Sequence, residues 1–141
     1  MTHSRLAVFV LVAALAAGVE AQQQSIAGDW TFSVEHIGLK LALEEKDSAV
    51  TGTLDWPHGD PVKLTGLFAN NTLILSGDSA GENFTIHIDV TGTRKTDGTL
   101  AGTVKAHFDE FNDAHSIVRV RNQDIPWTAE RGLKNVVHFP R

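Results

Sequence analysis

Apolar side chains recur at every second position through most of this chain, from Trp30 onward. Successive side chains of a β-strand point to opposite faces, so this spacing is typical of strands with one buried and one solvated face. Clusters of turn residues separate the runs, and few stretches show the spacing of an amphipathic helix. The alternation therefore predicts an all-β protein built from short antiparallel strands.

The apolar runs define the expected inner face, strand by strand. Alternate residues are apolar in segments 30–34, 39–43, 50–56, 62–68, 73–75, 84–90, 104–108, 118–120 and 127–129. No Asp, Glu, Lys, Arg or His stands among these inward positions. The sequence therefore predicts an apolar interior.

Two hairpin loops support the same inward parity independently of hydropathy. Residues 70–71 are both Asn, which tolerates positive φ in a two-residue loop, and segment 96–98 fits a three-residue loop that ends in Gly. The resulting inward pairs are Phe68 with Leu73 and Val90 with Val104. A slip of one residue would turn each apolar set toward solvent, so the two loops indicate an antiparallel meander.

Eight or nine such strands in sequence, with no crossover helix, leave two unpaired edges unless the sheet closes. We therefore predict an antiparallel up-and-down barrel of eight to nine short strands over residues 22–131, with a two-sheet β-sandwich as the alternative. Residues 132–141 would form a C-terminal tail. Four inward positions, 52, 66, 92 and 102, are glycines, which either let strands bend sharply or leave interior room.

The first 21 residues carry a different pattern. Arg5 lies in a short polar start, twelve unbroken apolar residues cover 6–17, and small residues lead to Ala21, which is the layout of a secretory signal peptide. The apolar run would rise about 18 Å as a helix, too little for a bilayer core of roughly 30 Å. We expect residues 1–21 to be removed and the domain to be exported, periplasmic or extracellular, with no membrane span left.

Composition excludes several classes of function. The chain of 141 residues contains no cysteine, which rules out disulfides, zinc ribbons, iron–sulfur clusters and a thiol nucleophile. Its formal net charge of −5 lacks the basic excess that drives binding to phosphate backbones, so we expect no nucleic-acid partner. An exported domain without disulfides has to be held together by packing and hydrogen bonding.

The first and last predicted strands carry a familiar residue pattern. Gly28-Asp29-Trp30 opens the first strand, and Arg131 closes the last. This pattern resembles the calycin superfamily of small exported barrels, the lipocalins and avidins, in which a Gly-x-Trp packs at the closed end and, in lipocalins, an arginine lies over the Trp. Together with Thr-Gly-Thr strands, the pattern also resembles small bacterial secreted domains of unassigned function. The resemblance implies that Gly28, Trp30 and Arg131 close the barrel.

The same resemblance does not supply a ligand. The disulfide pair and the Thr-Asp-x-x-Arg-like motif of lipocalins are missing, and Phe32 stands where avidins present an asparagine to biotin. No binding residue is carried over from either group.

Large apolar residues on the predicted inner face are candidates for lining a pocket for a small apolar molecule. The alternative is a structural or protein-interaction module with a filled core, because an eight-stranded barrel is near the size that side chains fill. The interior candidates are Phe32, Leu41, Trp56, Phe68, Phe84, Ile86, Phe108 and Trp127. Self-association is left open.

The 96–98 hairpin register places His87 opposite His107 on the outer face. Two imidazoles beside carboxylates form a weak candidate for a zinc or copper site, against the alternative of a solvated polar face. The longest loop collects acid and base groups, Asp109, Glu110, Asp113 and His115. No nucleophile motif accompanies them, so we predict no catalytic residue and no cofactor, and we prefer a non-enzymatic function.

Overall fold

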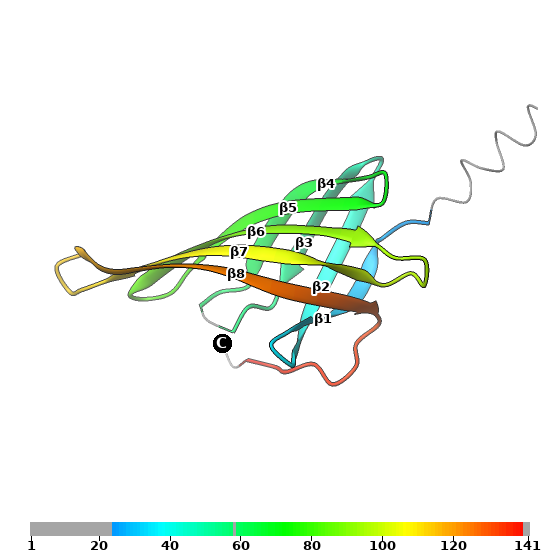
Figure 1. Ribbon diagram of the computed structural model, residues 1–141. Helices are drawn as coiled ribbons and strands as arrows, with labels where there is room; N and C mark the ends of the chain where they lie inside the picture. The colour runs from blue at the N-terminus through cyan, green and yellow to red at the C-terminus, as the bar shows by residue number, and fades with distance from the viewer. Residues whose placement is uncertain (1–23, 58, 140–141) are drawn as a thin grey trace, which may run out of the picture.

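The computed structural model describes residues 24–57 and 59–139, and it confirms the predicted up-and-down barrel (Figure 1). Eight antiparallel strands pair in chain order, and β8 pairs with β1 to close the sheet, so the barrel and not the sandwich is formed. The strands are β1 (Gly28–Val34), β2 (Ile37–Lys46), β3 (Ala49–Leu54), β4 (Val62–Ala69), β5 (Thr72–Ala80), β6 (Phe84–Arg94), β7 (Leu100–Phe111) and β8 (Ile117–Arg131). The described residues form no helix that is long and apolar enough to cross a membrane.

Both predicted hairpin registers are present. Asn70 and Asn71 have φ angles of 54° and 59° and form the turn between β4 and β5, and Gly98 has a φ of 89° in the turn between β6 and β7. The facing pairs are Phe68 with Leu73 and Val90 with Val104. Local turn chemistry and the apolar pattern thus lead to the same alignment.

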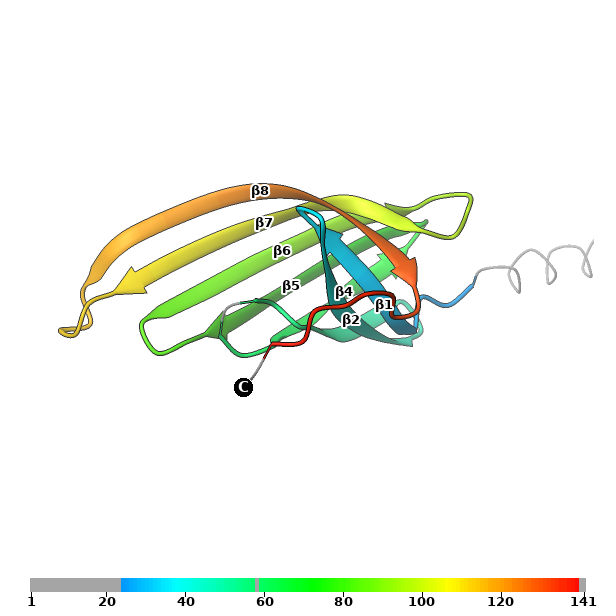
Figure 2. The same ribbon diagram turned by 90° about the horizontal axis from the view of Figure 1, so that it is seen from below.

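The barrel has a closed end and an open end. The closed end holds the turns from β2 to β3, β4 to β5 and β6 to β7, and segment 24–27 lies against it. β1 has 7 residues but β8 has 15, so the strands cannot all end at one level. At the open end the β7–β8 hairpin projects beyond the other strands (Figures 1 and 2).

The half of the barrel near the closed end is packed with side chains. Phe32 and Trp127 stack inside it, with ring centroids 4.7 Å apart and an interplanar angle of 20°. Trp30, Leu41 and Leu73 are at most 1% exposed. Burial of this apolar surface, at about 25 cal/mol per Å², is the main stabilising contribution in a chain without disulfides.

The inward glycines allow backbones to approach closely and do not leave open space. A Cβ atom at Gly66 would overlap the carbonyl oxygen of Ile74, and one at Gly102 would overlap that of Thr91. At Gly92 the Cβ would meet the ring of Trp127. Of the two alternatives raised by the sequence, interior room is not found at these glycines, where the strands pack closely instead.

The N-terminal part of β8 does not follow the predicted pattern. Ile125 and Trp127 point inward and are buried, and the strand runs without interruption from Ile117 to Arg131. Because side chains alternate, odd-numbered residues from Trp127 back to Arg119 continue the inner face, while Val118 and Val120 face outward with 58% and 50% of their surface exposed. The assignment of segment 118–120 to the interior is therefore wrong.

The C-terminal tail lies against its own barrel. The hydroxyl of Thr31 donates a hydrogen bond to the carbonyl oxygen of Gly132 at 2.7 Å and accepts one from the amide of Lys134 at 2.8 Å. Further on, the amide of Val137 donates to the carbonyl oxygen of Gly38 at 2.9 Å. The described part of the tail thus runs back across β1 and β2 (Figure 2).

Candidate functional site

A cavity of about 570 Å³ opens at the end of the barrel from which the β7–β8 hairpin projects. Its walls come from the β1–β2 turn, the segment after β3, and the inner faces of β6, β7 and β8. The apolar lining includes Val34, Trp56, Phe84, Ile86, Phe108 and Ile125. We call this space the open-end cavity.

Two stacked aromatic rings form one wall of the open-end cavity. Phe84 begins β6, Phe108 lies on β7, and their ring centroids are 5.2 Å apart with an interplanar angle of 27°. Ile86 faces Phe108 across the strand pair, and it is 5% exposed. Trp56, just after β3, is 7% exposed. An apolar ligand would meet mostly carbon surface here.

The eight interior candidates from the sequence fall into two groups. Four line the open-end cavity: Trp56, Phe84, Ile86 and Phe108. Phe32, Leu41 and Trp127 lie in the packed half, and Phe68 lies at the closed end, where the guanidinium carbon of Arg94 is 5.0 Å from its ring centroid. The inner face is therefore filled at one end and hollow at the other.

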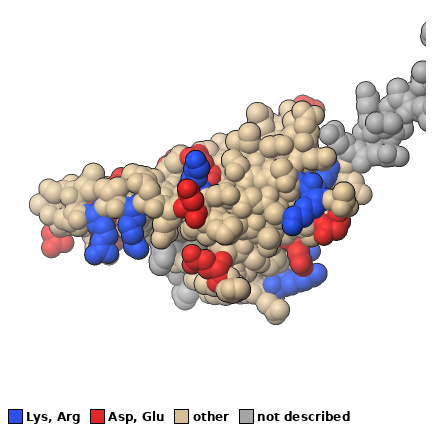
Figure 3. Space-filling view, in the orientation of Figure 1, with Lys and Arg blue, Asp and Glu red and all other residues tan. Residues whose placement is uncertain are grey.

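Charged side chains stand on the inner face at the mouth of the cavity, which corrects the expectation of a wholly apolar inner face. β8 pairs with β7 so that Arg121 faces Phe108 and Arg119 faces Glu110. Arg119 Nε lies 3.6 Å from Glu110 Oε2, and the guanidinium carbon of Arg121 lies 5.4 Å from the ring centroid of Phe108. Basic side chains accordingly follow one side of the projecting hairpin (Figure 3).

Sequence reasoning missed these charged residues because it assigned Val118 and Val120 to the inner face. A usable signal was present: counting back in steps of two from Trp127 leads to Gln123, Arg121 and Arg119. The count is valid only if β8 is one continuous strand, as the structure shows.

At the closed end the structure brings together the three residues that the calycin resemblance singled out. Trp30 faces Arg131 in the β1–β8 pair, and the guanidinium carbon lies 4.5 Å from the centroid of the Trp30 ring. Gly28 has a φ of 123°, and a Cβ atom there would lie 3.3 Å from Arg131 Nη1. A side chain at Gly28 would thus be strained and would press on the guanidinium.

Segment 24–27 is held over the closed end by both aromatic and cationic groups. The indole nitrogen of Trp30 donates a hydrogen bond of 2.9 Å to the carbonyl oxygen of Ile26, a residue with no exposed surface. Arg94 donates to the carbonyl oxygen of Gln24 at 2.7 Å. These contacts seal the end opposite to the cavity.

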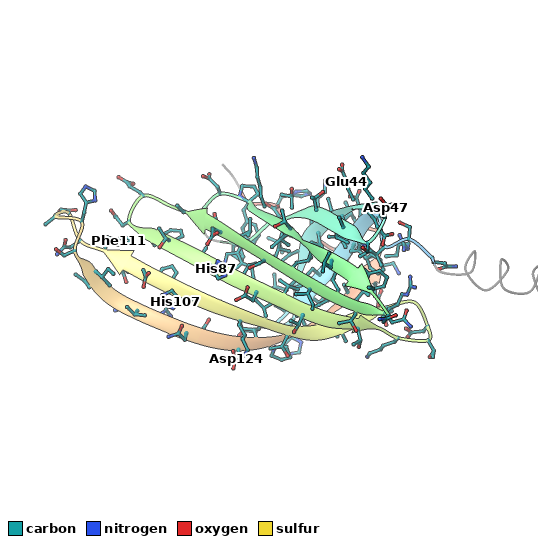
Figure 4. All side chains as sticks on the ribbon, turned by 90° about the horizontal axis from the view of Figure 1, so that it is seen from above. Glu44, Asp47, His87, His107, Phe111 and Asp124 are labelled. Atoms are coloured by element: carbon teal, nitrogen blue, oxygen red, sulfur yellow. The ribbon has the colours of Figure 1, made fainter. Side chains whose placement is uncertain are left out.

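His87 and His107 face each other on the outer surface of β6 and β7, as predicted from the hairpin (Figure 4). Each imidazole is engaged by its own neighbours. The partners are Asp78 at 2.7 Å and Asp89 at 3.2 Å for His87, and Asn122 at 2.6 Å and Asp109 at 3.1 Å for His107. Within residues 24–57 and 59–139, no group of three or more His, Asp or Glu side chains is arranged to hold a metal ion.

Ser76, Asp78, His87 and Asp89 form a polar row on the outer surface, and contacts within it shift the pKa values of His87 and Asp89. The hydrogen bond with Asp78 raises the pKa of His87 above 6.5, and the charge of Asp89 raises it further, although burial opposes both effects. Asp89 accepts a 2.6 Å hydrogen bond from Ser76, which lowers the pKa of its carboxyl group. The row is solvated, since the His87 side chain is 43% exposed.

Comparison of the chain with protein-family models, with curated proteins and with solved structures finds no match. The eight-stranded closed antiparallel barrel is compatible with a calycin-like fold.

Proposed function

We propose that this protein is an exported, non-enzymatic, calycin-like barrel that binds a small apolar molecule in the open-end cavity. The observation that carries the proposal is the apolar-lined volume of about 570 Å³ above a packed half-barrel. Small-molecule sites typically have volumes of roughly 300–1,000 Å³ and mostly apolar walls.

The packing below the cavity favours a preformed site. The stacked rings of Phe32 and Trp127 fill the packed half of the barrel, and the strands approach one another closely at Gly66 and Gly102, near the closed end. A rigid wall reduces the ordering cost of binding, so that more of the gain from covering Phe84 and Phe108 is expressed as affinity.

Binding of a neutral apolar probe tests the proposal directly. We expect N-phenyl-1-naphthylamine to bind the mature protein saturably, with increased probe fluorescence and altered tryptophan emission. Phe108→Asp places a carboxylate in the cavity wall and should weaken binding at least about tenfold, because the charge must be desolvated. Leu67→Asp is the matched control, since Leu67 is 55% exposed on the outer face of β4. Linear uptake without saturation, or equal affinities of the two variants, would contradict the proposal.

The proposed export rests on the signal-like layout of residues 1–21, which lie outside the described residues. Intact mass and N-terminal sequencing of the protein from the periplasm or the medium should give a chain that begins at Gln22. A chain that keeps Met1 and stays in the cytoplasm would overturn this part of the proposal.

A second candidate is a structural or protein-interaction module that works through its outer face. Ile117, Val118 and Val120 are 50% to 58% exposed on the projecting hairpin. Single exposed apolar residues are common on protein surfaces, whereas a group of them marks a site of interaction. This candidate predicts no saturable uptake of the neutral probe. The titration described above therefore separates the two functions.

A further inference from the structure

The mouth of the open-end cavity carries a cationic side chain, Arg121. Across residues 24–57 and 59–139, the ion pairs within 4.0 Å include Arg119 with Glu110 but none that involves Arg121. The Arg121 guanidinium lies instead over the face of Phe108, which belongs to the apolar wall. The polar side chain of Gln123 follows on the same inner face.

We propose that the ligand is an amphiphile with an apolar body and an anionic head. The body lies against Phe84, Ile86 and Phe108, and oxygen atoms of the head accept hydrogen bonds from Arg121 and Gln123. This assignment rests on the proposed binding function and specifies the chemical class of its ligand.

The route for the head follows from unequal strand lengths. β1 pairs with β8 only from Trp127 to Arg131, and its last residue is Val34. Within the described residues, the β8 segment 117–126 is paired with β7 alone. The barrel is therefore open sideways between the β1–β2 turn and β8, and Arg121 and Gln123 border this opening.

The chemistry of the guanidinium favours an anion at this place. Its planar N–H donors match the oxygen atoms of a carboxylate, sulfate or phosphate, and stacking on Phe108 restricts the orientation of the side chain before binding. Arg119 is not equivalent, since Glu110 offsets its charge. Glu35, on the β1–β2 turn, also lines the mouth, and its carboxylate would repel an anionic head toward β8.

Three amphiphiles with the same alkyl chain test the assignment. Dodecanoate and dodecyltrimethylammonium below their micellar concentrations, and dodecanol below its solubility limit, would compete with N-phenyl-1-naphthylamine for the mature protein. We expect dodecanoate to bind about tenfold more tightly than dodecanol, because it adds a charge-assisted hydrogen bond, and the ammonium compound to bind most weakly.

Two arginine variants then locate the head. Arg121→Gln should lower the affinity for dodecanoate to that for dodecanol and leave dodecanol unchanged. Arg119→Gln, the matched control, should leave dodecanoate within about twofold, since its charge is already offset. Circular dichroism establishes that both variants are folded.

The outcomes distinguish the two levels of the argument. If the neutral probe binds but dodecanoate has no advantage over dodecanol, or if Arg121→Gln leaves dodecanoate unaffected, the anionic head is wrong and the binding function stands. If neither the neutral probe nor any amphiphile binds, the proposed function fails and the ligand class with it.

Discussion

The guanidinium of Arg131 lies over the indole of Trp30, 4.5 Å from the ring centroid, and donates hydrogen bonds to two carbonyl oxygens of the N-terminal segment. Those bonds reach Ala27 at 2.8 Å and Ser25 at 2.9 Å. One side chain from the last strand thus fixes both the first strand and the segment that covers the closed end. In a chain without cysteine, this contact links the first strand of the barrel to the last.

Loss of that contact should destabilise the fold. Arg131→Met removes the cation–π contact and both hydrogen bonds, and we expect the free energy of unfolding to fall by about 1–3 kcal/mol in urea denaturation. Arg119→Met, on the exposed hairpin, should change it by less than about 0.5 kcal/mol. Equal stability of the two variants would mean that Arg131 is not a structural tie.

Close backbone approach at Gly66 should not tolerate a methyl group. Gly66→Ala would push the new Cβ into the carbonyl oxygen of Ile74, and the required shift of β4 against β5 should cost about 1–3 kcal/mol. Gly98→Asn serves as control, because no atom lies within 4 Å of a Cβ placed at Gly98 and because Asn tolerates a positive φ. A lower thermal unfolding midpoint for Gly66→Ala alone is the expected result, and unchanged midpoints for both would contradict it.

The pKa of His87 should depend on Asp78. Asp78→Asn removes the main hydrogen bond that raises this pKa, so the NMR titration of the His87 ring should move back toward 6.5. Because the folded value exceeds the unfolded one, protonated His87 stabilises the fold below 6.5, and this contribution is lost as pH rises through the raised value. The stability deficit of Asp78→Asn should therefore shrink with rising pH, and a deficit that grows instead would reverse the assignment.

The docking of the tail should depend on the hydroxyl of Thr31. Thr31→Val keeps the shape of a side chain that is 7% exposed but leaves the Gly132 carbonyl and the Lys134 amide without this partner. We expect hydrogen exchange at Lys134 and Val137 to accelerate by at least about tenfold, because both hydrogen bonds of the Thr31 hydroxyl are lost. Thr51→Val, at an exposed position, is the control and should leave the exchange rates of these amides unchanged. Unchanged rates in Thr31→Val would mean that other contacts hold the tail.

The strands and the registers of two hairpins, β4–β5 and β6–β7, could be predicted because they follow from local chemistry. Alternation specifies which side chains share a face, and the Asn70-Asn71 turn specifies which residues face one another across a hairpin. Contact between Trp30 and Arg131 was reached through a resemblance of short motifs, not from spacing. Closure of the barrel followed from the need to pair the outer strands.

The site could be predicted only in part. Trp56, Phe84, Ile86 and Phe108 belonged to the expected inner face, but the sequence does not separate them from Phe32 or Trp127, which have the same parity. Depth along the barrel axis distinguishes them, and depth is set by strand stagger, which no single strand encodes.

The sequence by itself determined an all-β chain, its turns and the faces of most strands. These features depend only on residues close together in the chain, because successive side chains of a strand point to opposite faces. The tertiary structure decided where that inner face is covered. β1 ends at Val34, opposite Trp127, whereas β8 extends beyond this point as far as its first residue, Ile117. The inner face of β8 therefore packs Trp127 in the core and presents Arg121 at the open mouth. Burial depends on which strands lie alongside, and that is a property of the closed barrel.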